Sequence, residues 1–509
     1  MGSKASEPLL ARPDGYGVTR MSIDDMLSGY AGDFGRWQLR HFLLTSAAWA
    51  LEALHTMVMI FSDREPDRVC TGADCTSLDP CRPGSGWEWV GGPGSSIVAE
   101  WGLVCGEKYK VGLVQAVFFA GCMVGAGVFG HLSDSSLGRK GSLTVVCALN
   151  TIFGLLTSIT PSYWVYTLLR FLTGFSTGGV GLCAFVLATE PVGPSKRGAA
   201  GMSTFYFFSG GIAILAGIAY HFQSWRSLYV VTSLPSLLFF LAVIPFLSES
   251  PRWYLVRGRV NEAVNVMRDI SRTNGKEIPH HYSLKLDDED SEDKEAGQQQ
   301  NKVSSGSILD VLRSRVTRVR LILSVAINLL CSIVYYGLSL NVVNLKTNLY
   351  ASVLLNSLAE IPAYALTALL LDRFGRKPLA IGTMILSGVF CTIGLLVGVF
   401  GEMEVTRMVC GVVGIFGMAA TYNLLFIYTA ELFPTVVRNV ALGCTAQACQ
   451  LGAIVAPFVV VLGESVPFAV FGVSGILGGI LVCYLPETMN QPLYDTMAGI
   501  EEGEREILK

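Results

Sequence analysis

The chain is 509 residues long, 51% of its residues are hydrophobic, only 15% are charged, and its mean hydropathy is +0.48. Apolar runs of about 20 residues, the length that crosses a bilayer, recur along nearly the whole sequence. This pattern excludes a soluble multidomain protein and indicates a polytopic membrane protein. The formal net charge of −3 contains no basic excess, so we expect no nucleic-acid partner.

Residues 1–40 precede the first apolar run and are polar, with acidic and basic side chains interspersed. No apolar stretch follows a basic start, so this segment is not a secretory signal. We predict a cytosolic tail that contains a short surface helix near residues 22–27.

A polar loop at residues 62–110 holds four of the 13 cysteines, namely Cys70, Cys75, Cys81 and Cys105. Four cysteines in one loop fit two disulfides in an oxidising compartment, with three possible pairings. A metal site is the alternative. The loop has no histidine beside these cysteines and their spacing is irregular, so we predict no metal site.

The apolar runs predict an all-α protein of twelve transmembrane helices, six within residues 41–247 and six within residues 319–485. The connection at residues 248–318 is hydrophilic. It contains a predicted helix at residues 261–272, followed by an acidic run that we expect to be disordered. We interpret this connection as a cytosolic tether between two bundles, and residues 486–509 as a second cytosolic tail.

Lysine and arginine concentrate in alternate connections, as at Arg139 and Lys140, and again at Arg373, Arg376 and Lys377. Such connections face the cytosol. Both termini are therefore predicted to be cytosolic, and the cysteine loop is predicted to face the cell exterior or an organelle lumen.

Charged motifs repeat between the two halves. Asp134 and Asp372 are 238 residues apart (372 − 134), and each precedes a Gly-Arg-Lys sequence. Glu190 and Arg197 recur as Glu431 and Arg438, both 241 residues later. Offsets this similar predict a duplication of six helices.

The paired acids and bases at the predicted cytosolic helix ends can form ion pairs. Topogenic charge bias explains the arginines and lysines but leaves the acids unexplained. We therefore predict that these ion pairs hold one access state closed and part in the other. The predicted gating residues are Asp134, Arg139, Glu190, Arg197, Asp372, Arg376, Glu431 and Arg438.

Two carboxylates lie inside predicted spans, where a charge costs about 2.5–3.5 kcal/mol and usually has a function. We predict that Glu52 attracts a cationic substrate or takes part in proton coupling. It shares a helix face with His55, which could titrate and is a second candidate for coupling. Glu360 shares a face with Tyr364, and a carboxylate beside an aromatic ring suits a quaternary ammonium group. The alternative is that these groups are neutral or hydrogen-bonded within the bundle.

Further polar residues lie on predicted helix faces. Tyr335, Gln447 and Gln450 could line a substrate cavity between the halves, or equally could form interhelical hydrogen bonds. Arg170, near the end of the fourth span, could snorkel to the membrane interface.

These motifs resemble those of the major facilitator superfamily, and the cysteine loop with Ala188-Thr189-Glu190-Pro191 and Glu431-Leu432-Phe433-Pro434 narrows the resemblance to the organic ion transporters. The sequence is most similar to the plant organic cation/carnitine transporters, over residues 35–487. The resemblance implies alternating-access transport of organic ions, with Arg170 influencing proton coupling. Gln450 is neutral where animal cation carriers of this family have an acidic residue, so it leaves the substrate charge open.

We therefore expect a secondary transporter of organic cations or carnitine-like zwitterions, possessing no cofactor and no enzymatic activity. The small organic solute, the lipid bilayer and protons are its expected partners. A sugar or polyol porter and a non-transporting solute receptor are the alternatives. The plasma membrane is the favoured location and the vacuolar membrane is the alternative.

Overall fold

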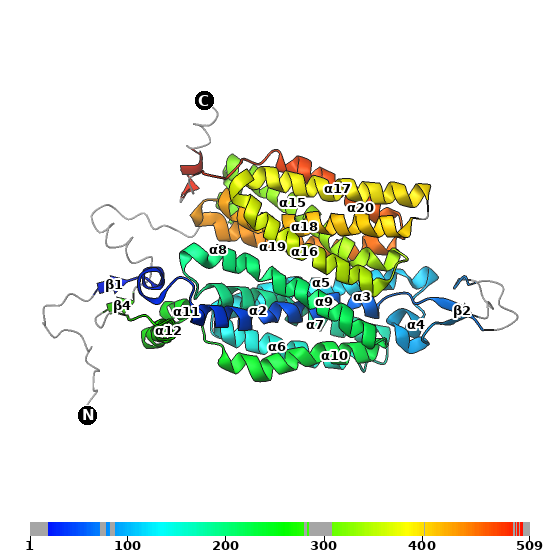
Figure 1. The fold of residues 1–509 in the computed structure, drawn as a ribbon, viewed down its shortest axis with the longest axis horizontal. Helices are drawn as coiled ribbons and strands as arrows, with labels where there is room; N and C mark the ends of the chain where they lie inside the picture. The colour runs from blue at the N-terminus through cyan, green and yellow to red at the C-terminus, as the bar shows by residue number, and fades with distance from the viewer. Residues whose placement is uncertain are drawn as a thin grey trace.

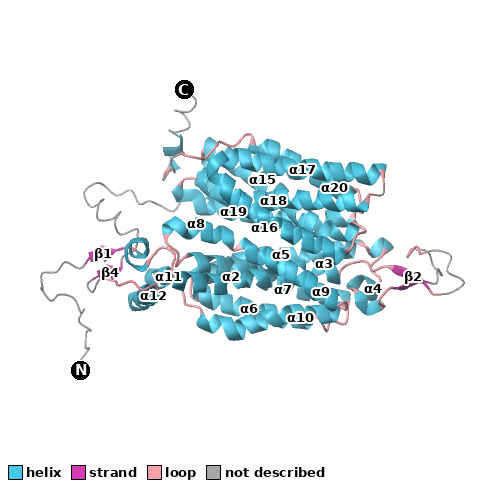
Figure 2. Ribbon diagram, viewed as in Figure 1, coloured by secondary structure: helices cyan, strands magenta, loops and turns pink. Residues whose placement is uncertain are grey.

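The structure, a computed structural model, is a bundle of long helices (Figure 2). It describes residues 19–71, 78–81, 87–278, 282–284, 308–401, 403–491, 494, 496–497 and 499–501. In these residues eleven helices are long and apolar enough to cross a membrane, and a twelfth apolar helix, α20 (Val466–Val482), is shorter. The prediction of an all-α protein with twelve helices is confirmed.

The first six transmembrane segments form the lower half of the view in Figure 1. The first begins at Arg36, five residues before the expected boundary. The six segments are α2 with α3 (Arg36–Met57 and Met59–Ser62), α5 (Tyr109–Asp134), α6 (Gly138–Thr157), α7 (Tyr163–Thr189), α8 with α9 (Pro194–Ser203 and Phe205–His221), and α10 (Trp225–Leu238), which a π-helical turn extends over Phe239–Val243.

The second six segments form the upper half. A short helix, α14 (Ile308–Arg313), leads into them, and the seventh segment begins at Arg315 rather than at residue 319. The six segments are α15 (Arg315–Leu340), α16 (Leu349–Phe374), α17 (Arg376–Phe400), α18 (Glu404–Leu432), α19 (Thr435–Val461) and α20.

The halves pack against each other mainly where helix α5 contacts α19 and where α9 contacts α16. The described ends of the chain lie at one end of the bundle, which we call the terminal end. The cysteine loop lies at the opposite end, which we call the disulfide end.

Glycines allow the close packing of α5 on α7. A Cβ atom added at Gly125 would lie 1.9 Å from the carbonyl oxygen of Phe175, and one added at Gly174 would lie 2.0 Å from that of Phe118. Each helix therefore presents glycine to the backbone of the other, which is how small residues bring membrane helices together.

A small folded unit covers the terminal end of the first half. Strand β1 (Thr19–Met21) pairs in parallel with β4 (Tyr282–Leu284), which lies in the connection between the halves. Around this pair pack the short helices α1 (Ile23–Met26), α11 (Pro251–Val256) and α12 (Val260–Thr273).

The predicted helices near residues 22–27 and 261–272 are present as α1 and α12, but the first of them is not a surface helix. Met26 and Leu27 of the predicted surface helix are fully buried. Apolar side chains from both segments form one core, so burial of hydrophobic area fixes them together. The acidic run at residues 285–293 lies outside the described residues.

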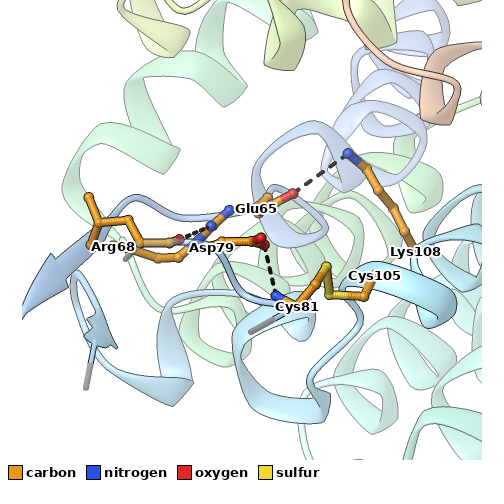
Figure 3. The surroundings of a disulfide bond; sticks show 7 residues. Glu65, Arg68, Asp79, Cys81, Cys105 and Lys108 are labelled. Carbon is orange, nitrogen blue, oxygen red and sulfur yellow. Dashed lines mark hydrogen bonds and ion pairs between the residues drawn. A yellow bond between two sulfur atoms is a disulfide. The ribbon is translucent and has the colours of Figure 1, made fainter. Parts of the chain in front are cut away.

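The disulfide end carries a second small unit. Strands β2 (Arg68–Cys70) and β3 (Trp87–Trp89) are antiparallel, and α4 (Ile97–Trp101) follows them. Cys81 and Cys105 form a disulfide (Figure 3). Cys70 is also disulfide-bonded, while Cys75 lies outside the described residues.

Candidate functional site

Glu360 lies near the middle of α16 and is 1% exposed, so it faces the bundle and not lipid. Its Oε1 accepts a hydrogen bond from the Tyr335 hydroxyl at 3.1 Å, and its Oε2 accepts one from the Tyr364 hydroxyl at 3.2 Å. The Ser209 hydroxyl of α9 donates to Oε2 as well. Because α9 belongs to the first half, this last hydrogen bond joins the two halves.

Aromatic rings surround this carboxylate. Tyr364 has Phe205 and Tyr206 of the opposite half at centroid distances of 5.9 and 5.7 Å. Tyr335 has Tyr422 at 5.3 Å. The predicted grouping of Glu360, Tyr364 and Tyr335 is therefore present in the structure, and the opposite half adds residues that sequence reasoning missed. No sequence pattern pointed to these additional residues, because serine and aromatic residues are common in membrane helices. They are Ser209, Phe205 and Tyr206.

The second predicted carboxylate, Glu52 of α2, is half-buried and lies against α7. A Cβ atom added at Gly181 would lie 2.1 Å from its Oε2, and that oxygen is buried without a hydrogen-bond partner in the described part of the chain. Glu52 thus points into the bundle, but no hydrogen bond joins it to Glu360 among the described residues.

The two predicted glutamines of α19 are not part of this cluster. Gln447 is exposed, Gln450 is half-buried, and neither side chain forms a hydrogen bond within the described residues. No contact given by the structure places them with Glu360.

The predicted coupling residues, His55 and Arg170, lie side by side in the first half. His55 is fully buried, and its Nε2 lies 3.0 Å from the Ser236 hydroxyl. Arg170 is 1% exposed; it donates twice to the His55 carbonyl at 3.3 Å and lies over the Phe118 ring. The interpretation that Arg170 snorkels is wrong, because backbone and ring contacts hold its guanidinium inside the bundle.

Six of the eight predicted gating residues form two matching groups at the terminal end. Arg139 pairs with Asp134 at 3.0 Å and with Glu190 at 3.1 Å. The second group repeats this arrangement with distances of 3.8 and 2.9 Å, and its members are Arg376, Asp372 and Glu431. Each group lies within one half, so these ion pairs cannot themselves join the halves.

The remaining two predicted gating residues differ between the halves. Arg197 pairs with Asp24 of the N-terminal segment at 2.6 Å, and Asp24 also pairs with Arg252. In the second half, Nε and Nη2 of Arg438 are buried without a partner among the described residues. The N-terminal segment thus supplies an acid that the repeat alone did not predict.

A cavity of about 1130 Å³ lies at the disulfide end, lined by residues of both halves. Asp63 and Gln115 line it from the first half, and Asn344 and Tyr350 line it from the second. The nearby disulfide loop is charged: Glu65 pairs with Arg68 and, at 3.7 Å, with Lys108 (Figure 3). Asp63 is a further buried carboxylate that sequence reasoning missed.

Comparisons with known proteins agree with this architecture. Residues 84–498 match the family described as Sugar (and other) transporter. Organic cation/carnitine transporter 4 of Arabidopsis thaliana is 64% identical, over 99% of this chain and 97% of that protein. The organic cation transporter protein of Drosophila melanogaster is 36% identical, over 81% and 74% of the two chains. The partially occluded inward open xylose transporter XylE from E. coli has a TM-score of 0.64 at 16% identity, over 90% of this chain and 100% of that chain.

Twelve helices in two halves, together with the match to the transporter family model and to the relatives, identify the chain as a transporter of the major facilitator superfamily. The chain belongs to the sugar (and other) transporter family, and within it to the organic cation/carnitine transporters. It is a membrane transporter and not an enzyme.

Proposed function

We propose that this protein moves organic cations or carnitine-like zwitterions across a membrane by alternating access. The observation that carries the proposal is the position of Glu360. It is a buried carboxylate of one half, hydrogen-bonded by Ser209 of the other half and surrounded by tyrosine rings. The names of the relatives, organic cation/carnitine transporters, support the same substrate class.

Binding follows from this geometry. When the halves separate on one side, the hydrogen bond from Ser209 to Glu360 breaks and the carboxylate loses a donor. A solute ammonium group compensates the charge, and the rings of Tyr335 and Tyr364 add cation–π attraction of about 0.5–2 kcal/mol. Solute binding thus replaces contacts between the halves and allows them to move past one another.

We also propose an orientation of the protein in the membrane. The terminal end faces the cytosol, the disulfide end faces the opposite side, and the protein works in the plasma membrane with proton coupling. The ion pairs of Arg139 and of Arg376 hold helix ends together within each half, so that each half moves as a unit. The concentration of basic residues at the terminal end supports this orientation.

The test replaces Glu360 with glutamine, which keeps the shape and removes the charge. In proteoliposomes, Glu360→Gln should lower uptake of labelled carnitine and tetraethylammonium at least about tenfold, because a charge-assisted contact of ~1.5–3 kcal/mol is lost. Tyr364→Phe is the matched control: it keeps the ring, removes only a hydroxyl, and should retain most of the uptake.

Three results would contradict the proposal. Unchanged uptake of both substrates by Glu360→Gln would remove Glu360 from the site. Competition by hexoses, with none by organic cations, would make the protein a sugar porter instead. Binding of solute without net flux would indicate a receptor.

A further inference from the structure

Asp63 follows the end of the first membrane span and is 4% exposed, yet it lines the cavity at the disulfide end. Three side chains donate hydrogen bonds to it. Oδ1 accepts from the Ser62 hydroxyl at 2.7 Å and from the Tyr166 hydroxyl at 2.8 Å. Within the described part of the chain, Oδ2 accepts only from the Gln115 amide, at 3.2 Å. The oxygen with fewer donors, Oδ2, is the one free to take a proton.

A chain of hydroxyl groups leads from Asp63 to Tyr229, whose ring lies beside Arg170. The Tyr229 hydroxyl lies 2.8 Å from that of Tyr166, and since Tyr166 gives its proton to Asp63, Tyr229 donates to Tyr166. The Arg170 guanidinium lies over the Tyr229 ring, 5.5 Å from its centroid. Neither Asp63 nor Arg170 forms an ion pair within the described residues, and the charge of Arg170 acts on the Asp63 carboxyl.

The other charged groups near Asp63 are paired, stacked on a ring or exposed. Those that line the cavity or face Asp63 are Arg64, Glu65, Asp67, Arg68, Lys108, Arg170, Lys346 and Glu464. Asp67 is exposed, and Arg68 pairs with Glu65. Glu65 pairs with Lys108, Lys346 pairs with Glu464 at 2.8 Å, and Arg64 lies over the Tyr350 ring. Tyr163, the remaining titratable group beside this network, donates its hydroxyl to the Lys110 carbonyl. Asp63 is therefore the buried acid of this cavity that is left for a proton.

We propose that Asp63 is a proton-binding site of the transport cycle, loaded from the cavity at the disulfide end. This inference rests on the proposed function and names the group that couples it to protons. A proton from cavity water binds Oδ2, the Gln115 amide rotates so that its oxygen accepts the new O–H, and the same proton leaves to water after the halves have moved.

Protonation changes the contacts of the first half. Burial raises the pKa of the Asp63 carboxyl, and the hydrogen bonds from Ser62 and the charge of Arg170 oppose that rise. Once Asp63 is neutral, Arg170 loses its compensating charge. Because Arg170 binds the His55 carbonyl of α2, the contact between α2 and α7 is then the one that changes.

The first test measures the proton directly and needs no substrate. Infrared spectra of the purified protein in lipid are recorded across a pH series, in the region of the protonated carboxylic acid. The wild type should show a titrating band that Asp63→Asn abolishes and Asp67→Asn retains, because Asp67 is an exposed carboxyl lining the same cavity. A band unchanged in Asp63→Asn would overturn the proposal.

The second test separates coupling from transport. Proteoliposomes are loaded with tetraethylammonium, and exchange without a gradient is compared with accumulation driven by a pH gradient. Asp63→Asn should retain exchange and lose both gradient-driven accumulation and substrate-induced proton flux. Retained proton flux, or loss of exchange by a folded variant, would overturn the proposal. A wild type that moves no organic cation would refute the proposed function, and the infrared result would still decide whether Asp63 binds a proton.

Discussion

Two glutamates show how the same contact acquires different properties in the two halves. Glu249 accepts hydrogen bonds from the backbone N–H groups of Arg139 and Lys140, at 3.1 and 3.0 Å. Glu487 accepts from those of Arg376 and Lys377, both at 3.0 Å. Each carboxylate thus satisfies free donors at a helix N-terminus, where negative charge is favoured.

The surroundings of these two caps differ. Burial raises the pKa of Glu249 despite its hydrogen bonds. Glu487 is more exposed; burial opposes ionisation there too, but the backbone N–H donors prevail and lower its pKa. A carboxyl with a raised pKa stabilises the fold less as pH rises through that pKa, whereas one with a lowered pKa stabilises it less as pH falls through that pKa.

Glutamine variants of these two caps should therefore show opposite pH dependence. The stability that Glu487→Gln loses relative to wild type, roughly 0.5–2 kcal/mol, should grow as pH rises from below the lowered pKa of Glu487 to the ordinary glutamate value of 4.5. Glu249→Gln should gain relative to wild type as pH rises from 4.5 through the raised pKa of Glu249. Thermal unfolding of the detergent-purified variants measures both trends, and parallel trends would contradict the assignment.

At the scale of helices, α5 and α7 depend on glycine where their backbones approach. Gly125 meets the Phe175 carbonyl, whereas a Cβ atom added at Gly127, on the same helix, would meet nothing within 4 Å. The two positions thus offer a matched pair of substitutions in which only one creates a clash.

We expect Gly125→Ala to destabilise the protein by about 1–3 kcal/mol, because one methyl group forces the two helices apart. Gly127→Ala should be neutral or slightly stabilising, since alanine favours helix by about 1 kcal/mol over glycine. The melting temperature of each purified variant tests this, and equal melting temperatures would show that α5 and α7 pack less closely than described.

At the scale of the whole molecule, the halves touch at both ends. At the terminal end Phe185 of α7 lies against Phe426 of α18, with ring centroids 5.6 Å apart. At the disulfide end Phe61 stacks on Tyr350 at 5.5 Å. Alternating access requires each of these contacts to open in turn.

Cross-linking one contact should therefore stop the cycle. The double variant Phe185→Cys/Phe426→Cys, treated with a short thiol-reactive cross-linker, should lose uptake, and each single variant should keep it under the same treatment. A reversible cross-linker should restore uptake when it is cleaved. Full uptake by the cross-linked protein would show that α7 and α18 need not separate.

Some of the candidate site was readable from the sequence. Glu360 was visible because a carboxylate in an apolar run is expensive, and Tyr364 because it lies four residues further along the same helix. Asp63 was hidden because it sits just past the apolar run, among the ordinary charges of a loop. Its burial depends on Tyr166 and Gln115 from other helices, and no local pattern announces such contacts.

The sequence by itself determined the number of spans, the duplication and the acid–base motifs, because bilayer thickness and charge bias act on local stretches of chain. Only the tertiary structure decided whether a contact lies within one half or joins the two halves. It closed the ion pairs of Arg139 and Arg376 within their own halves, folded the N-terminal segment onto the connection, and placed Ser209 against Glu360. These outcomes depend on how helices distant in the sequence pack, since an atom's partners are set by that packing and not by the neighbouring residues.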